Sequence, residues 1–283
     1  MAKSWLVASR RPADEAYARI SRVTLLLAKL ILTPLAILAA ILAGRRWGDS
    51  IGGWLAGLPV TSAPVAAFLA IEHGHAFAAA ASAGSIAAVA SHASFCMAYS
   101  AGSRHRWWGA FLCGTFGYVG SAAIINAFEL PPIALLVLSA ASLAVARLVM
   151  PRASMGVVTA AAPRWEIPAR VFLVTAVVVG VTSLATTLGA RGSGVAASFP
   201  WIGGALAVFA HRAQGAAAGV AVLRGMAIAL YSFLAFFAVL GVALTRIDLP
   251  TSFVAATAAA LAVQVVTLRI LRGEARAPVA ERA

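Results

Sequence analysis

The sequence predicts an all-α membrane protein that crosses the bilayer about nine times and contains two related halves. Hydrophobic residues make up 62% of the 283 residues and charged residues only 11%, whereas about a quarter of the residues of a soluble domain are charged. Apolar segments long enough for membrane helices follow one another along the chain. The stretch 48–95 also aligns with the stretch 189–236 without a gap, which indicates an internal repeat.

The basic residues lie where a membrane protein carries its topology signals. The formal net charge is +13, and all but two of the 22 basic residues are arginines, most of them in short loops and tails between apolar segments. Such arginines orient membrane helices and contact anionic lipids. We therefore expect a multi-pass protein of the bacterial inner membrane whose partner is the lipid bilayer, and no binding of nucleic acid.

The polar stretches divide the chain into two membrane units. Residues 1–22 form a polar N-terminal tail, and 23–150 form the first unit. A basic connecting loop at 151–167 leads to the second unit at 168–271, and a short tail follows at 272–283. Because the loops within each unit are short, little of the chain is left for a soluble domain.

Nine apolar segments are bounded by charge, proline or glycine, and none shows the alternation of a membrane β-strand. In the first half they are Val23–Ala43, Ile51–Ile71, His75–Ala101, Trp107–Ala127 and Pro131–Met150. In the second half they are Pro168–Leu188, Gly192–Ala210, Ala216–Thr245 and Thr251–Ile270. Trp107 and Trp108 follow Arg104 and Arg106, a combination typical of the membrane interface. Abundant alanine and glycine favour close packing of the helices.

The internal repeat is carried by residues that rarely match by chance. At an offset of 141 the matching pairs include Gly48/Gly189, Gly53/Gly194, Pro59/Pro200, Phe68/Phe209, Gly74/Gly215, Gly84/Gly225, Ser91/Ser232 and Phe95/Phe236. The alignment resumes at an offset of 119, where Glu129-Leu130-Pro131 matches Asp248-Leu249-Pro250. The first half therefore carries 22 extra residues, about one helical span, which is the segment 107–127.

Two stretches resemble a known family of membrane proteins. The second half, with GSGVAASFPWIGGALAVFAHRAQG at 192–215 and a long apolar segment after it, resembles the small GlpM-type proteins. The first half, with GGWLAGLPVTSAPVAAFLAIEHG at 52–74, resembles the start of larger bacterial membrane proteins in which two such units are fused. The shared motifs consist of glycine, proline and aromatic residues, so the resemblance implies an architecture and no particular activity.

The number of spans decides how the two halves are related. If the segment 107–127 spans, nine helices result, the N-terminus lies outside, and the two cores have opposite orientations, as in inverted-repeat transporters. If it is a re-entrant hairpin, eight spans and parallel repeats result. The segment is as apolar as its neighbours, which favours nine spans. Both alternatives place the C-terminal tail in the cytoplasm, because Arg269, Arg272 and Arg276 follow the last span.

Pro59 and Pro200 occupy equivalent sites within the second span of each half. Proline lacks a backbone N–H and kinks or breaks a helix, and Thr61 and Ser62 follow the first of these sites. Paired broken helices at membrane depth are typical of binding sites in transporters. These four residues are therefore candidates for a substrate path. The alternative is a plain proline kink whose backbone groups bond to nearby hydroxyls.

A few polar side chains fall well inside the apolar segments. Ser91 and His92 lie midway through the third segment, Ser232 is the repeat partner of Ser91, and Arg224 lies about two turns into the eighth segment. An ionisable group inside a membrane segment is a functional candidate by default. We therefore add these four residues to the substrate-path candidates. For His92 the alternative is a neutral packing residue that is hydrogen-bonded inside the bundle.

The sequence contains no phosphate-binding glycine loop, serine-nucleophile motif, paired carboxylates or metal-ligand spacing. We therefore expect no enzyme, no cofactor and no metal site. The duplicated cores and paired breaks favour a small secondary transporter, or a translocator of an unknown small solute or lipid, that works by alternating access. The alternative is a non-transporting accessory or scaffold protein of envelope or exopolysaccharide assembly. A homo-oligomer is compatible with either function.

Overall fold

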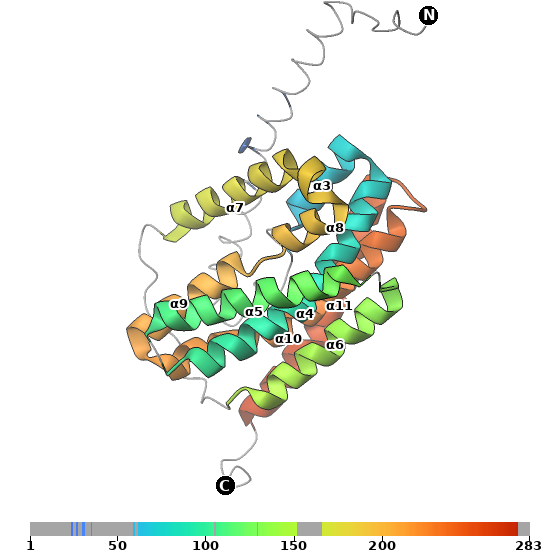
Figure 1. Ribbon diagram of the computed structural model, residues 1–283. Coiled ribbons are helices and arrows are strands. Elements are labelled where there is room, and N and C mark those ends of the chain that lie inside the picture. The colour runs from blue at the N-terminus through green and yellow to red at the C-terminus, as the bar shows by residue number, and fades with distance from the viewer. Residues whose placement is uncertain are drawn as a thin grey trace, which may run out of the picture.

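The computed structural model describes residues 59, 62–104, 106–128, 130–151 and 166–276, and the single positions Thr24, Leu27, Leu30, Ile31 and Leu35. Over these residues the chain is helical and contains no strand (Figure 1). The helices are α3 (Ser62–His73), α4 (His75–Gly102), α5 (Trp107–Ala127), α6 (Pro132–Val149), α7 (Glu166–Ser183), α8 (Ala185–Ala197), α9 (Trp201–Gln214), α10 (Ala216–Ala243) and α11 (Leu249–Arg276). The prediction of an all-α protein is confirmed for this part of the chain.

Among the described residues, five helices are long and apolar enough to cross a membrane: α4, α5, α6, α10 and the first 19 residues of α11. The bent pair α8–α9 has the length and composition of a sixth span. These helices agree with a multi-pass membrane protein. The total of nine spans stays a prediction, because 23–43 and the first part of 51–71 lie mostly outside the described residues. Helix α5 runs without interruption through 21 residues, so 107–127 is not a re-entrant hairpin.

The helices of the second half differ in two places from the predicted segments. The span predicted at 168–188 is shorter, since α7 ends at Ser183 and α8 begins two residues later. The boundary expected near 188–192 is a kink inside α8 at Gly189, whose φ of +68° glycine adopts without strain. Helix α11 continues to Arg276, beyond the predicted end of the last apolar segment. Hydropathy reports only the membrane part of a helix, and the helix itself extends further.

The long helices α4 and α10 lie at the centre of the bundle and run antiparallel (Figure 1). Cys96 Sγ lies 3.9 Å from the carbonyl oxygen of Leu223, and a side chain at Gly241 would contact Ser82. From Ser82 to Cys96 along α4, the contacted position on α10 moves back from Gly241 to Leu223. The two helices therefore run antiparallel. Helices α3, α5, α6 and α8 pack on α4, while α6, α9 and α11 pack on α10.

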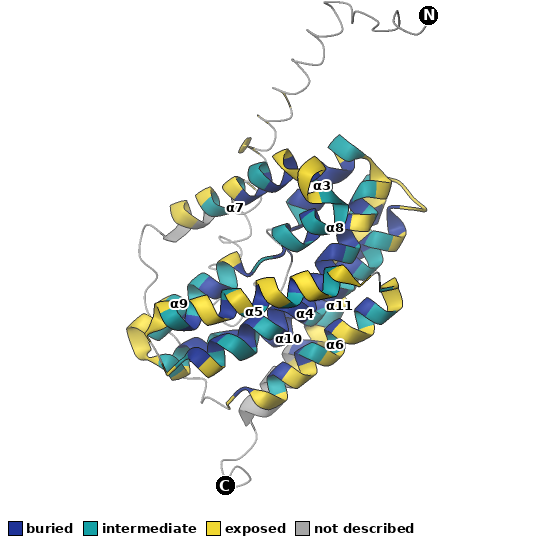
Figure 2. Cartoon of the chain, viewed as in Figure 1, coloured by how far each residue is buried: buried dark blue, intermediate teal, exposed yellow. Residues whose placement is uncertain are grey.

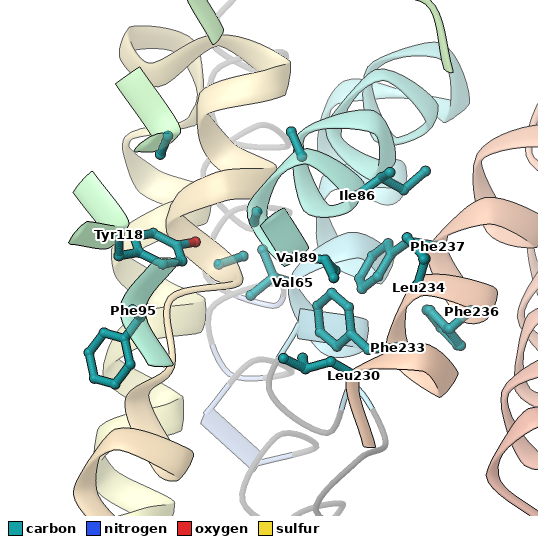
Figure 3. Packing of buried hydrophobic residues seen from close by; sticks show 14 of the residues in the cluster. Val65, Ile86, Val89, Phe95, Tyr118, Leu230, Phe233, Leu234, Phe236 and Phe237 are labelled. Carbon is teal, nitrogen blue, oxygen red and sulfur yellow. The ribbon is translucent and has the colours of Figure 1, made fainter. Parts of the chain in front are cut away.

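The outer helices expose apolar faces, whereas α4 and α10 are mostly buried (Figure 2). Phe116 on α5, Leu148 on α6 and Val254 on α11 are all largely exposed. In a bilayer such faces contact lipid chains, which are as apolar as the side chains themselves. Inside the bundle, aromatic residues such as Phe95 and Phe237 belong to one buried apolar cluster (Figure 3).

Helix α8 crosses α4 with the two backbones in direct contact. A methyl group at Gly194 would overlap the carbonyl oxygen of Ala81, and one at Gly84 would overlap the carbonyl oxygen of Arg191. Small residues at a crossing let membrane helices approach closely. The crossing holds the C-terminal end of α8 inside the bundle.

Where both are described, the two aligned stretches share their local structure. Helix α3 is followed by Gly74, with φ of +88°, and then by α4, which has 28 residues. Helix α9 is followed by Gly215, with φ of +91°, and then by α10, which also has 28 residues. The two glycines are 141 positions apart, which is the offset of the sequence alignment. Because glycine adopts positive φ most easily, this turn explains why glycine stands at both positions.

Candidate functional site

A helix break at Pro200 separates α8 from α9. The two helix axes are bent by 40° across the break. Pro200 has φ −73° and ψ 56°, and the Trp201 N–H donates to the carbonyl oxygen of Phe199 at 2.7 Å, which is the geometry of an inverse γ-turn. The helix ends here because proline has no N–H to continue the hydrogen-bond ladder. The structure therefore places Pro200 at a break within an apolar span, as the sequence predicts.

Hydroxyl groups from three neighbouring helices satisfy the carbonyls at the end of α8. The contacts are Ser85 Oγ to Gly194 at 3.3 Å, Tyr118 OH to Val195 at 2.8 Å and Ser62 Oγ to Ala197 at 3.0 Å. The Gly194 and Val195 carbonyls also share the Ser198 N–H, at 3.2 and 3.1 Å, and the hydroxyls supply further donors where the helix ladder stops, which matters where water is absent. The end of α8 is thus closed by side chains of α3, α4 and α5.

Pro59 stands at the start of α3 in the same way that Pro200 stands at the start of α9. The Ala63 N–H donates to the Pro59 carbonyl at 2.7 Å, and the Gly204 N–H donates to the Pro200 carbonyl at 2.8 Å. Ser62, three residues after Pro59, donates its hydroxyl hydrogen to the carbonyl of Ala197, which lies three residues before Pro200. One hydrogen bond therefore joins the two proline sites, which the sequence could only align.

Three buried hydroxyl groups make no hydrogen bond within the described part of the chain: those of Ser91, Ser198 and, on α7, Thr175. Ser198, directly after α8, is 2% exposed, and Ser91, in the middle of α4, is fully buried. Each can donate to or accept from a polar solute or a water molecule. Ser232, which the sequence alignment pairs with Ser91, donates instead to the Ala229 carbonyl at 2.7 Å. Thr61, the remaining candidate at the first proline site, lies outside the described residues.

His92 contacts the break through Tyr118. Its Nδ1 lies 2.9 Å from the Ala88 carbonyl oxygen, so in the neutral ring Nδ1 carries the proton and Nε2 can accept a hydrogen bond. The ring packs edge-on against Tyr118, with 5.4 Å between ring centres, and against Phe233 at 6.2 Å. The structure therefore places this buried histidine beside the tyrosine that holds the end of α8.

Arg224 belongs to another part of the bundle. Its Nη1 donates to the carbonyl oxygen of Arg147 at 2.8 Å and to that of Met150. These carbonyls lie at the C-terminal end of α6, where a cation offsets the negative end of the helix dipole. The structure therefore assigns Arg224 to the contact between α10 and α6, and not to the group of residues around the break.

Tyr118 and Ser85, which close the break, are not among the candidates that the sequence suggests. A tyrosine inside an apolar span is a usable signal, because a buried phenol needs a hydrogen-bond partner. A serine gives no such signal, since serines within helices commonly bond to their own backbone. The contact of Tyr99 OH with His211 Nδ1, at 3.1 Å, also joins helices far apart in sequence, α4 and α9.

No protein-family model, curated protein or solved structure matches this chain. The resemblance to GlpM-type proteins therefore stays a prediction.

Proposed function

We propose that this protein is a small secondary transporter, or a translocator of a small solute or lipid, that works by alternating access between two inverted repeats. The observation that carries the proposal is the meeting of the two proline sites inside the bundle, joined by the hydrogen bond from Ser62 to Ala197. Broken helices paired across two repeats form the solute sites of many transporters. The break at Pro200 lies within the described residues, and a matching break at Pro59, where the residues before the proline lie outside them, stays a prediction; a break in one half alone would be an ordinary proline kink.

An inverted repeat accounts for the packing of α4 against α10. The two helices occupy equivalent positions in the aligned stretches and run antiparallel. His92 and Phe233 are 141 positions apart in sequence, and their ring centres lie 6.2 Å apart. Equivalent residues of two antiparallel helices meet where a two-fold axis passes between them, perpendicular to both. For helices that cross a bilayer, such an axis lies in the membrane plane.

The antiparallel direction of α4 and α10 supports nine spans with the N-terminus outside and the C-terminus in the cytoplasm. Helices α5, α6, α7 and the bent pair α8–α9 separate α4 from α10 along the chain. If each of these four elements crosses the bilayer, α10 runs in the direction opposite to α4, as the contacts require. The excess of arginine in the connecting loop and after the last span favours the cytoplasm for these segments.

The hydroxyl contacts at the end of α8 suggest how access alternates. A shift of α8 and α9 relative to α3, α4 and α5 would break the contacts of Ser62, Ser85 and Tyr118. The released carbonyls would then be ligands for hydrogen-bond donors of a solute. Ser198 Oγ, buried and without a partner among the described residues, adds a further polar atom at the same break.

A non-transporting accessory protein is the second candidate. The direct backbone contact of α8 with α4 at Gly84 and Gly194 favours a rigid bundle, and a rigid bundle suits a scaffold of envelope or exopolysaccharide assembly. In such a protein the break stays closed. The two functions therefore differ in whether water reaches Ser198 from both sides of the membrane.

The reaction of a single cysteine with a charged, membrane-impermeant thiol reagent tests the proposal. A Ser198→Cys variant, in a Cys96→Ala, Cys113→Ala background, is reconstituted into liposomes and exposed to the reagent from either side. Alternating access predicts reaction from both sides. Ala207→Cys, fully buried on α9, is the control and should stay unreactive. Protection of Ser198→Cys on both sides would rule out the transporter and favour the scaffold.

A further inference from the structure

Arg212 and Trp107 bring two distant basic segments together at one end of the bundle. The guanidinium carbon of Arg212, in the last turn of α9, lies 5.4 Å from the centre of the Trp107 ring at the start of α5. This is a cation–π contact. Arg104 and Arg106 precede Trp107 in the turn between α4 and α5. The fold therefore forms a basic patch from Arg104, Arg106 and Arg212.

The basic patch lies on helices that carry no acidic residue. All three arginine side chains are exposed. The chain contains no aspartate or glutamate between Glu72 and Glu129, or between Glu166 and Asp248. Helices α4, α5, α9 and α10 therefore supply no carboxylate to neutralise the patch, and its potential favours an anionic partner.

An exposed apolar stripe continues from the basic patch along α5. Trp108, Leu112, Phe116 and Val119 are spaced by four, four and three residues, so they lie on one face of the helix. Their side chains are between 46% and 73% exposed, and Figure 2 shows this helix with its exposed face outward. In a bilayer the stripe contacts acyl chains, and the tryptophan at its end lies at the level of the headgroups.

We propose that the basic patch and the apolar stripe together bind one anionic phospholipid. Its phosphate contacts the guanidinium groups of Arg104, Arg106 and Arg212, which bind phosphate oxygens through paired hydrogen bonds. Its acyl chains lie along the stripe on α5. A soluble phosphate would contact the patch alone, whereas a phospholipid matches the charge and the adjoining apolar face. No residue of the site belongs to the helix break, and the closed bundle alone is enough to form the site.

Native mass spectrometry of the full-length protein tests this site. The protein is prepared in detergent with phosphatidylglycerol or with phosphatidylcholine of the same chain length, and the fraction that retains one lipid is measured. We expect preferential retention of phosphatidylglycerol. Arg212→Gln should weaken this retention about fivefold, the effect of one basic residue near an anionic headgroup. Arg246→Gln removes an equally exposed arginine after α10 and should leave retention unchanged.

The remaining arms separate the lipid from other anions. Phe116→Ser, in the apolar stripe, should also lower retention, because the acyl chains lose part of their contact. An excess of soluble glycerol phosphate should not displace the lipid, and displacement would indicate a free-phosphate site. Equal losses with Arg212→Gln and Arg246→Gln would indicate diffuse attraction. The proposal is overturned by displacement with glycerol phosphate, by equal losses with the two arginine variants, or by equal retention of the two lipids.

Discussion

Removing the Tyr118 hydroxyl should loosen the closed helix break. The variant Tyr118→Phe deletes the donor to the Val195 carbonyl, which is bound at 2.8 Å. It keeps the ring, which packs against His92 and Phe199 with 5.4 and 5.0 Å between ring centres. The change therefore removes one hydrogen bond at the end of α8 and preserves the aromatic packing around it.

The expected effect is about 1 kcal/mol. The Val195 carbonyl keeps the Ser198 N–H as a donor at 3.1 Å, so the loss is that of one hydrogen bond. Such a bond contributes about 0.5 to 1.5 kcal/mol in general and about 0.6 kcal/mol on average between membrane helices. Val195 is half-buried at the end of a helix, which favours a value between these figures. For a chain of this size the loss lowers Tm by about 2 to 4 °C. Because the bond exists only in the closed break, opening should become about fivefold more favourable.

Thermal unfolding in detergent measures the first effect, and the labelling rate of Ser198→Cys measures the second. Tyr231→Phe is the matched control, since Tyr231 donates to the Ala140 carbonyl at 3.0 Å between α10 and α6. Both variants should lose similar stability, but only Tyr118→Phe should speed the labelling of Ser198→Cys, by about fivefold. Equal labelling rates in the two backgrounds would refute the role of Tyr118 in closing the break.

Three further predictions concern other parts of the fold. Gly194→Ala places a methyl group against a carbonyl of α4 and should lower the free energy of unfolding by about 1 to 3 kcal/mol. Gly225→Ala is the control, because a methyl group there meets no described atom within 4 Å, and it should not lower the free energy of unfolding. Arg224→Gln should cost about 1 kcal/mol in the same assay, because α6 loses a cation at its C-terminal end, and an unchanged Tm would contradict that role. Hydrogen bonds from the backbone and hydroxyl of Thr251 lower the pKa of Asp248, so its stabilising effect is present above the ordinary carboxyl pKa and lost as pH falls through the lowered value. Asp248→Asn should therefore lower Tm at neutral pH and leave it unchanged in acid, and a constant difference across pH would exclude this linkage.

The helices and their interruptions follow from local features of the sequence. The apolar segment predicted at 107–127 coincides with α5, because a membrane helix satisfies its own backbone and needs only apolar length. The break at Pro200 was predictable, since the missing N–H acts at the position of the proline itself. The kink at Gly189 displaced the predicted boundary, because glycine permits a positive φ without requiring it.

The contacts around the break depended on the tertiary structure alone. Ser62 and its acceptor are 135 positions apart, and Tyr118 and its acceptor are 77 apart. A hydroxyl in an apolar segment has many possible partners, and the way the helices cross decides which one it reaches. That crossing depends on close backbone packing at Gly84 and Gly194, which no local pattern specifies. The sequence therefore determined which segments are helical and where one breaks, whereas only the packed bundle decided that the break is closed and that Arg224 binds the end of α6.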